Sequence, residues 1–567
     1  MNSPPRHVAG HVDRQTFALG AFQPRVTERL DAWRREDVGG RLWAKDPTLW
    51  AAPGTPEITD RLGWLTLDTA ADYLDEAQRV AQQAHDEGVG DVVLLGMGGS
   101  SLAPDVFQRT FGNAPGWPML TVLDSTHPAV VRAVRERIDP ARTWFLVSSK
   151  SGTTLESLSF FRYFWAEVGR VTDTPGRHFL AITDPGTPLE QLARSRGFRH
   201  VCPGQPDVGG RYSALTAFGL VPAALIGVDV ARLLDRARTL AEACAFCVPE
   251  PSNPGLALGA ALGELAKAGR DKVTFFTSPR LDAFPAWLEQ LIAESTGKND
   301  QGIVPVADEP PGEPGVYGDD RVFVLIDVEG YPCAAGATTV ERLAALGHPV
   351  IRIRLSDVFD LGREMFRWEF ATAAASVVLR LHPFDQPDVQ LAKELARKAM
   401  SAAAEAGPSG DTAVRADREA DLRDAVRRFL GAAHPHDYVG LQAYISPTDT
   451  ATRLLEDART TVRDRLQLAT TLGYGPRFLH STGQLHKGGA NNGLFLQILD
   501  EPAPDVPVPE TEYTFGQLIR AQALGDYQAL VQRGRRVLRV QLGTQAEHGL
   551  RALVAAIEQA VGIARRG

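Results

Sequence analysis

Short runs of β-branched and aromatic residues alternate with longer helical stretches, and this alternation constrains the fold of the chain more than any other feature. Seven such runs are clear: Val92–Leu95, Leu120–Leu123, Trp144–Val147, Phe179–Thr183, Val273–Thr277, Val322–Ile326 and Val350–Ile353. In the first half of the chain each run ends in a polar or glycine-rich loop and continues as a helix. This pattern is typical of a parallel sheet with helices on both faces. The sequence therefore predicts an α/β protein with doubly wound parallel sheets in αβα sandwiches.

The alternation is interrupted by a Pro/Ser/Gly-rich segment at residues 249–255, which we interpret as a linker between two α/β halves. We predict an N-terminal arm, a first domain and a second domain, over residues 1–61, 62–248 and 256–567. An Ala/Arg/Glu-rich stretch at about 389–434 is predicted to be a surface helical pair inserted in the second domain. The final strand, near Arg536–Leu542, is expected to join the second sheet.

Composition excludes several classes of partner and compartment. A net charge of −9 argues against a nucleic acid or an anionic membrane as the main partner. Four cysteines in 567 residues are too few for a disulfide framework and favour a reducing compartment. The longest mostly apolar run, residues 214–228, is broken by Gly and Pro and is shorter than the roughly 18 residues of a membrane span. We therefore expect a cytoplasmic protein with no nucleic-acid or membrane partner.

Two polar loops are expected at neighbouring strand ends. Gly96-Met-Gly-Gly-Ser-Ser101 lets backbone N–H groups approach an anion, and Ser149-Lys-Ser-Gly-Thr-Thr154 adds hydroxyl and ammonium donors. A helix N-cap is the simpler explanation of the second loop, but it accounts for one hydroxyl and not for four. The two loops together predict a pocket for a terminal phosphate group.

A dinucleotide site is an alternative for the first loop. Asp124 closes the next strand, where a ribose-binding acid lies in nicotinamide-dependent enzymes. Against this alternative, Ser101 stands where the third glycine is expected, and the hydroxyl-rich loop competes for the same crevice.

Two charged residues stand beside glycines. Arg211, in Gly209-Gly-Arg-Tyr-Ser213, is expected to project from a glycine turn, either to stabilise a developing oxyanion or to form an interdomain salt bridge. Glu294 lies in the last turn of a predicted helix that ends at Gly297. The helix macrodipole disfavours a carboxylate there, which suits a general base, although a surface position is the alternative.

Two histidine clusters differ in what they predict. His480 and His486 lie among glycines and hydroxyls, in a predicted loop rather than a core helix, which favours a functional role over a structural one. In His434-Pro-His-Asp437 the proline disrupts helical spacing and no further ligand is apparent, so we predict a turn and no metal site.

Together these segments resemble the phosphoglucose isomerase family, which is built from two sugar-isomerase (SIS) domains. The motifs are Gly96-Met-Gly-Gly-Ser-Ser101, Ser149-Lys-Ser-Gly-Thr-Thr154, Gly209-Gly-Arg-Tyr-Ser213, Glu294-Ser-Thr-Gly-Lys298 and Pro383-Phe-Asp-Gln-Pro387 leading to Lys393. The resemblance runs from about Leu62 to the C-terminus. One departure is the histidine motif, Leu479-His-Ser-Thr-Gly-Gln484, which follows Lys393 instead of preceding it. In this order the chain is similar to the isomerase half of transaldolase–isomerase fusions.

The resemblance implies a role for each matching residue. The implied sugar-phosphate contacts are Gly99, Ser100, Ser149, Lys150, Ser151, Thr153 and Thr154, with Gln290 as a further substrate contact. Glu294 is the implied proton-shuttling base and Arg211 the implied enediolate-stabilising cation. Lys393 and His480 are the implied ring-opening residues, and His486 is the reserve for His480.

The activity implied by the resemblance is interconversion of glucose 6-phosphate and fructose 6-phosphate through a cis-enediol, a step of glycolysis and gluconeogenesis. It requires no metal or nucleotide cofactor, because a carboxylate moves the proton and a cation stabilises the charge. The family also implies a homodimer. Two alternatives stay open: an isomerase that also accepts mannose 6-phosphate, and a non-catalytic SIS regulator that binds a sugar phosphate.

Overall fold

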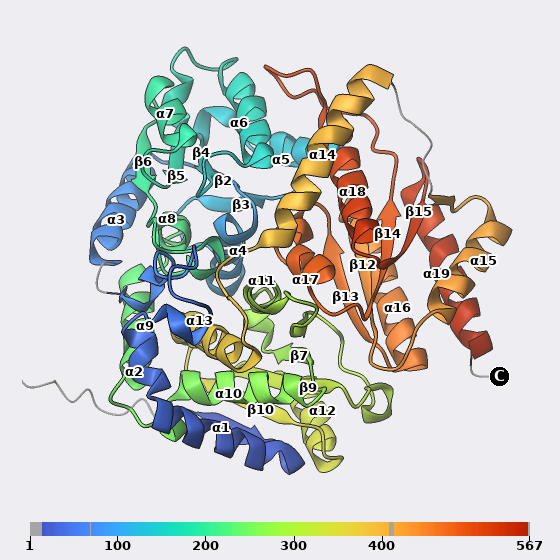
Figure 1. Cartoon of the computed structure of the whole chain (residues 1–567). Helices are drawn as coiled ribbons and strands as arrows, with labels where there is room; N and C mark the ends of the chain where they lie inside the picture. Colours follow the sequence, from blue (N-terminus) through green and yellow to red (C-terminus); the bar gives the residue numbers. More distant parts are fainter. Residues whose placement is uncertain (1–13, 68–69, 407–412, 565–567) are drawn as a thin grey trace, which may run out of the picture.

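The computed structural model describes residues 14–67, 70–406 and 413–564, and these contain three five-stranded sheets surrounded by helices (Figure 1). All seven runs predicted as strands are strands, within two residues at each end. Nearly all strand pairs are parallel, so the predicted α/β fold class is confirmed. Among the described residues, no helix combines the length and apolar character needed to cross a membrane.

The first sheet has the order β3-β2-β4-β5-β6 and is parallel throughout. Its strands are β2 (Asp91–Leu95), β3 (Met119–Leu123), β4 (Thr143–Ser148), β5 (Phe179–Thr183) and β6 (His200–Pro203). Side chains alternate along each strand, so Val92 and Leu94 face one core and Val93 and Leu95 another. The first core contains α3 (Ala70–Asp86), α4 (Leu102–Phe111) and α8 (Ala217–Leu225), and the second contains α5 (Pro128–Arg137), α6 (Leu155–Val168) and α7 (Pro188–Ser195).

The second sheet has the order β1-β10-β9-β7-β8. Its parallel strands are β7 (Lys272–Thr277), β8 (Val304–Val306), β9 (Arg321–Val328) and β10 (Val350–Leu355), and its helices are α9 (Val230–Ala243), α10 (Pro254–Lys267), α11 (Phe284–Thr296), α12 (Ala334–Ala345) and α13 (Leu361–Leu379). The N-terminal arm adds the antiparallel edge strand β1 (Gln15–Ala18). The arm continues as α1 (Gln23–Glu36) and then α2 (Val38–Trp43), and α1 packs on α10.

The third sheet has the order β11-β15-β14-β12-β13 and is parallel. Its strands are β11 (Val414–Arg415), β12 (Tyr438–Tyr444), β13 (Ala469–Tyr474), β14 (Gly493–Leu499) and β15 (Arg536–Gln541). The expectation that the final strand joins the second sheet is wrong, because β15 pairs with β14 and β11. The buried apolar strands β12 and β14 form the centre of a separate sheet, to which β15 is added.

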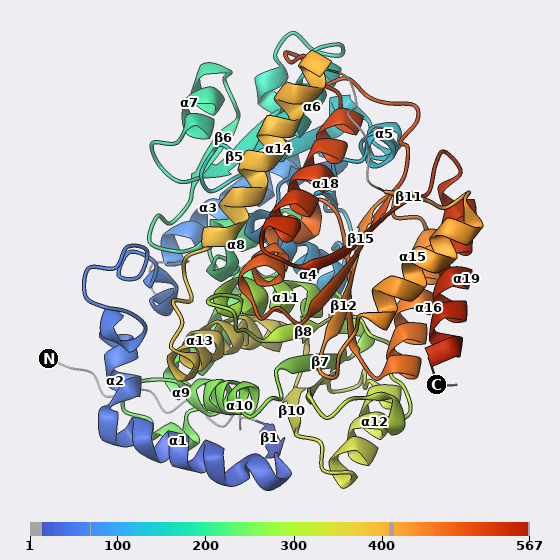
Figure 2. The same ribbon diagram turned by 45° about the vertical axis from the view of Figure 1, so that its right-hand side comes forward.

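The helices of the third sheet lie on two faces. One face packs on α15 (Glu419–Gly431), α16 (Asp449–Leu466) and α19 (Ala546–Ala564), and the other on α17 (Gly483–Gly488) and α18 (Phe515–Gln532). α14 (Pro387–Ala406) runs alongside α18 in both views (Figure 1 and Figure 2), whereas α15 packs against α19. The stretch predicted as a surface helical pair therefore supplies two helices to different parts of the structure.

A buried carboxylate joins the second sheet to the third. Glu309 is fully buried and accepts hydrogen bonds from Arg321 Nη2 on β9 at 3.2 Å and from Thr470 Oγ1 on β13 at 3.1 Å. Arg459 on α16 donates to the carbonyls of Ala307 and Thr470 at 3.0 and 2.7 Å. Burial by itself raises the pKa of Glu309, but the nearby guanidinium groups outweigh it and lower the pKa. Glu309 is therefore charged and stabilised in place.

We predict that Glu309→Gln destabilises the protein by about 3–5 kcal/mol, because it leaves the buried guanidinium of Arg321 without its counter-charge. Denaturant unfolding measures the change. Glu313→Gln is the matched control, since the Glu313–Arg342 pair is exposed on the surface, and it should leave the unfolding midpoint unchanged. Equal midpoints for Glu309→Gln and the wild type would contradict this account of the junction.

Candidate active site

Short segments that follow strands of all three sheets meet at one place. Three of them are single helical turns: η5 (Gly98–Ser100) after β2, η8 (Gly210–Tyr212) after β6, and η13 (Arg477–His480) after β13. The fourth is helix α11, which follows β7. η8, α11 and η13 each contact η5. The first predicted anion loop therefore lies at the centre of the candidate site.

This close approach depends on two glycines. Gly98 has a φ of +54°, and a Cβ there would lie 2.9 Å from the His480 carbonyl oxygen and 3.0 Å from Gln290 Nε2. A Cβ on Gly99 would lie 2.0 Å from the carbonyl oxygen of Gly210. The loop can therefore contact its neighbours through its backbone only because it lacks side chains at these positions.

The second predicted loop follows β4 and precedes α6. Its hydroxyls pair with one another: Ser149 Oγ lies 2.9 Å from Thr154 Oγ1, and Ser151 Oγ lies 2.9 Å from Thr153 Oγ1. Thr154 is the N-cap residue of α6, but its side chain makes no capping hydrogen bond. Helix capping by Thr154 therefore does not explain this cluster of hydroxyls.

The side chain of Lys150 turns toward the end of the first sheet. Its ammonium lies 2.5 Å from Asp184 Oδ2 and donates to the Gln205 carbonyl at 3.0 Å. Burial lowers the pKa of Lys150, and the Asp184 carboxylate opposes that effect. A direct contact between this ammonium and a sugar phosphate stays a prediction.

Glu294 and Gln290 project from one face of α11, four residues apart. Both are buried, and Gln290 Nε2 donates to Glu294 Oε2 at 3.2 Å and to the His480 carbonyl at 2.8 Å. Arg211 Nη1 lies 3.5 Å from Glu294 Oε2. The structure thus brings a buried carboxylate, an amide and a guanidinium together beside the first anion loop.

Arg211 and Lys298 both hold the turn that precedes α14. Arg211 Nη2 donates to the carbonyls of Pro383 and Asp385 at 2.5 and 3.0 Å, and its Nε donates to Ser295 Oγ at 2.9 Å. Lys298 Nζ lies 2.6 Å from Asp385 Oδ1. Burial, together with the charge of Arg211, lowers the pKa of Lys298 to about 7. Lys393 lies on α14, but its side chain is outside the described residues.

His480 contacts a residue that the sequence did not single out. Its Nε2 lies 2.9 Å from Glu156 Oε1, in the first turn of α6, only two residues after the hydroxyl loop. Gln522 Nε2 donates to the same Glu156 oxygen at 2.7 Å, and Thr126 Oγ1 donates to Gln522 Oε1 at 2.8 Å. This network fixes the plane of the His480 ring.

His486 has a different environment. The prediction of a loop is wrong here, because His486 lies in the short buried helix α17. Its Nδ1 is 3.2 Å from Gln442 Nε2, and its ring packs 4.7 Å from that of Phe495. Burial lowers the pKa of His486 well below its usual value. Of the two histidines, His480 is the one beside Gln290 and Glu156.

The other candidate features have structural partners. Asp124, the candidate ribose-binding acid, pairs with Arg477 at 3.2 Å. His434 and Asp437 form a hydrogen-bonded turn, as predicted, and Asp437 also binds Arg536. Within the described ranges, no three His, Cys, Asp or Glu side chains gather as metal ligands would.

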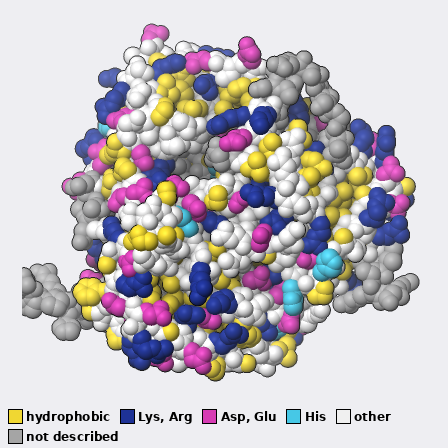
Figure 3. Space-filling model, viewed as in Figure 1, with side chains coloured by type: hydrophobic (Ala, Val, Ile, Leu, Met, Phe, Trp, Pro, Cys, Tyr) yellow, Lys and Arg dark blue, Asp and Glu magenta, His cyan; other side chains and the backbone are white. Residues whose placement is uncertain are grey.

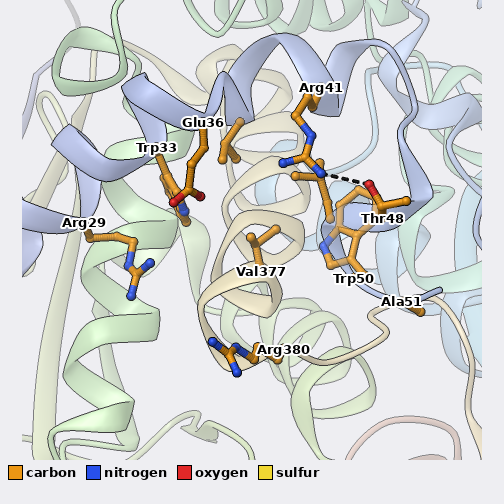
Figure 4. Close-up of a pocket in the computed structure, with 11 residues that line it drawn as sticks. Arg29, Trp33, Glu36, Arg41, Thr48, Trp50, Ala51, Val377 and Arg380 are labelled. Carbon is orange, nitrogen blue, oxygen red and sulfur yellow. Dashed lines mark hydrogen bonds between the residues drawn. The ribbon is translucent and has the colours of Figure 1, made fainter.

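A separate pocket lies under the N-terminal arm, where residues of α1, α2 and the following turn face the end of α13 (Figure 4). Its volume is about 410 Å³, and Trp33, Trp50 and Val377 supply apolar lining among arginines. None of the predicted site residues lines it.

Figure 3 shows a different hollow, between the helices of the first sheet and α14, on a face where acidic and basic side chains are interspersed.

Comparison with known proteins gives concordant matches. The family model for phosphoglucose isomerase matches residues 76–328. The glucose-6-phosphate isomerase of Rubrobacter xylanophilus is 29% identical over 416 residues, which cover 63% of this chain and 93% of that protein. The glucose-6-phosphate isomerase of a Thermus thermophilus strain is 30% identical over 385 residues, which cover 60% of this chain and 90% of that protein.

Solved structures agree with the sequence matches. A hypothetical protein of Thermus thermophilus aligns with a TM-score of 0.60 at 27% identity, covering 68% of this chain and 100% of that chain. A glucose-6-phosphate isomerase of Chlamydia trachomatis shares the fold, with a TM-score of 0.59 at 20% identity over 69% of this chain and 89% of that chain.

We predict that Gly99→Ala lowers kcat/KM of the reaction catalysed at this site by about 10²-fold, because the new Cβ must displace the backbone of Gly210 and move two site segments apart. Gly210→Ala is the control, since a Cβ there meets no atom within 4 Å, and it should keep wild-type kinetics. Steady-state assays of the two folded variants measure the difference. Wild-type kinetics for Gly99→Ala would show that the contact does not set the site geometry.

Proposed function

This chain belongs to the phosphoglucose isomerase family, and we propose that it interconverts glucose 6-phosphate and fructose 6-phosphate by proton transfer through a cis-enediol intermediate. It is therefore an aldose–ketose isomerase with a sugar phosphate as substrate. The structural observation that supports this reaction best is the position of Glu294, a buried carboxylate with Arg211 Nη1 3.5 Å from one of its oxygens.

Glu294 is the proposed base. The reaction moves one proton from C2 of the aldose to C1 of the ketose, which one carboxylate on one side of the substrate can do without a cofactor. Negative charge develops on the carbonyl oxygen as the enediol forms. Arg211, whose guanidinium is already held by Ser295 and the Pro383–Asp385 carbonyls, supplies a preorganised positive charge for it. Gln290 donates to Glu294 and holds its carboxylate in orientation.

The two polar loops are the proposed phosphate site. Gly99 offers a backbone N–H group at the end of β2. The backbone N–H of Ser100 already donates to the Met97 carbonyl at 3.1 Å, so Ser100 offers its hydroxyl. The loop after β4 offers hydroxyls and an ammonium. The proposed contacts in that loop are Ser149, Lys150, Ser151, Thr153 and Thr154. Backbone and hydroxyl donors at the carboxyl ends of parallel strands suit a dianionic phosphate group.

His480 and Lys393 are the proposed ring-opening residues. The hydrogen bond between His480 Nε2 and Glu156 orients the imidazole and leaves Nδ1 as the nitrogen for the ring oxygen of the sugar. His486 is buried among aromatic rings, and burial lowers its pKa well below the usual value, which favours a structural role for it. The family resemblance also supports two further proposals: the protein acts in the cytoplasm, and it forms a homodimer.

Glu294→Gln should lower kcat by about 10²-fold or more, because the amide keeps the shape of the side chain and cannot accept the C2 proton. A coupled assay in both directions measures it. Glu289→Gln is the matched control on the same helix. Burial raises the pKa of Glu289 to about 8, so this carboxyl is already mostly neutral at pH 7 and the amide replaces it with little change. Normal turnover by Glu294→Gln would refute the assignment of the base.

His480→Ala should slow the isomerisation of the cyclic hexose phosphate but spare the exchange of the C2 proton in an open-chain substrate. The probe is a four-carbon aldose 4-phosphate, which cannot cyclise because its O4 carries the phosphate. NMR in D₂O follows the exchange, and His486→Leu is the control, expected to keep the cyclic reaction. Loss of the cyclic reaction in His486→Leu alone would reverse the choice between the two histidines.

A further inference from the structure

The turn that carries His480 extends from the third sheet to the other two. η13 follows β13 of the third sheet, whereas the side chains that bind His480 come from elsewhere: Glu156 from α6 and Gln290 from α11. All of these contacts lie within one chain. The position of His480 therefore depends on what fixes η13 against the first and second sheets.

Arg477, the first residue of η13, makes the contact with the first sheet. Its Nη2 donates to Asp105 Oδ2 at 2.9 Å, and its Nε lies 3.2 Å from Asp124 Oδ2. Asp105 belongs to the first turn of α4, directly after the first anion loop, and Asp124 follows the end of β3. One guanidinium thus joins η13 to two elements that flank the phosphate loop.

The other end of the turn is held by hydrogen bonds in addition to the contact between His480 and Glu156. Ser481 Oγ donates to Glu289 Oε1 at 3.3 Å, and Gln290 Nε2 donates to the His480 carbonyl at 2.8 Å. The absence of a side chain at Gly98 leaves room for the His480 backbone, which lies against it. The ion pairs of Arg477 are therefore the attachment of the turn through a guanidinium, at the end opposite to His480.

The buried carboxyl of Asp124 requires the guanidinium of Arg477 as its counter-charge. Burial raises the pKa of Asp124, and Arg477 is the main opposing influence. Without the guanidinium, a buried carboxylate would lose its counter-charge, and the local structure would rearrange to hydrate it or neutralise it. That rearrangement would occur three residues from His480.

We propose that Arg477 is a positioning residue for His480, which holds the ring-opening turn against the phosphate loop through its ion pairs with Asp105 and Asp124. This inference rests on the proposed function. Arg477 acts through His480, so its contribution is confined to ring opening and does not extend to the proton transfer at C2. Asp124 consequently has a positioning role of its own.

The test compares two reactions of Arg477→Met, whose side chain keeps apolar bulk but has no charge. On the cyclic hexose phosphate, we expect kcat to fall by about 10²-fold, since displacement of a catalytic group by about 1 Å has an effect of this size. On the four-carbon aldose 4-phosphate, exchange of the C2 proton should proceed at the wild-type rate. Arg477→Met combined with His480→Ala should be no slower on the cyclic substrate than His480→Ala alone.

Arg109→Met is the matched control. Arg109 lies on α4, the helix that carries Asp105, and pairs with Asp282 just before α11. This pair is about half exposed and neither partner belongs to η13, so both reactions should stay at wild-type rates. Should Arg477→Met fail to fold, Asp124→Asn replaces it, with a smaller loss expected in the cyclic reaction only.

Each outcome separates the inference from the function on which it rests. A wild-type protein without isomerase activity refutes the proposed function. An active wild type with an Arg477→Met variant that slows both reactions equally, or slows neither, refutes the positioning role. Additive losses in the double variant also refute it.

Discussion

The ion pair and hydrogen bonds of the buried Glu309 carboxylate are the interactions on which the arrangement of the second and third sheets depends. Arg321 belongs to the second sheet and Thr470 to the third, and both bind Glu309 Oε1. Thr470 lies on β13, the strand that leads directly into η13. A shift of the third sheet against the second would therefore move the turn that carries His480. The chemistry proposed for His480 at one end of β13 therefore relies on the buried charges at the other end.

The candidate active site repeats this use of buried charge at smaller scale. Arg211 contacts Glu294 while it holds the turn that leads into α14, and Lys298 holds the same turn through Asp385. Preorganised charges of this kind stabilise developing charge without reorganisation, since their orientation is fixed before the substrate binds. Hydrogen bonds thus fix the Arg211 guanidinium where charge is proposed to develop, and the glycines allow close approach where the phosphate is proposed to bind.

The local elements could be predicted from the sequence, but the third sheet could not. The seven predicted strands are bounded by clear loops. In the stretch that we assigned to the second domain, β12 and β13 follow long helices and β14 follows the short helix α17. Sheet membership depends on which strands pair, and no local pattern encodes that pairing. The two polar loops could be singled out from the sequence because glycines and hydroxyls cluster at strand ends.

Glu156 was missed because a glutamate in the first turn of a helix has a sufficient local explanation in the helix macrodipole. Its partner, His480, is 324 residues away in sequence. His480 and His486 could not be distinguished from the local sequence, because both stand among glycines. Only the packing of α17 shows that His486 is enclosed. The domain boundaries and the roles of the site residues stay predictions.

The most direct test of the account is the fate of deuterium in glucose 6-phosphate labelled at C2. If one carboxylate moves the proton through an enediol, fructose 6-phosphate formed in H₂O should carry part of the deuterium at C1 and lose the rest to water. Mass spectrometry and NMR of the product measure both fractions. Complete retention of deuterium at C1 under all conditions would indicate a hydride shift and would contradict the role given to Glu294.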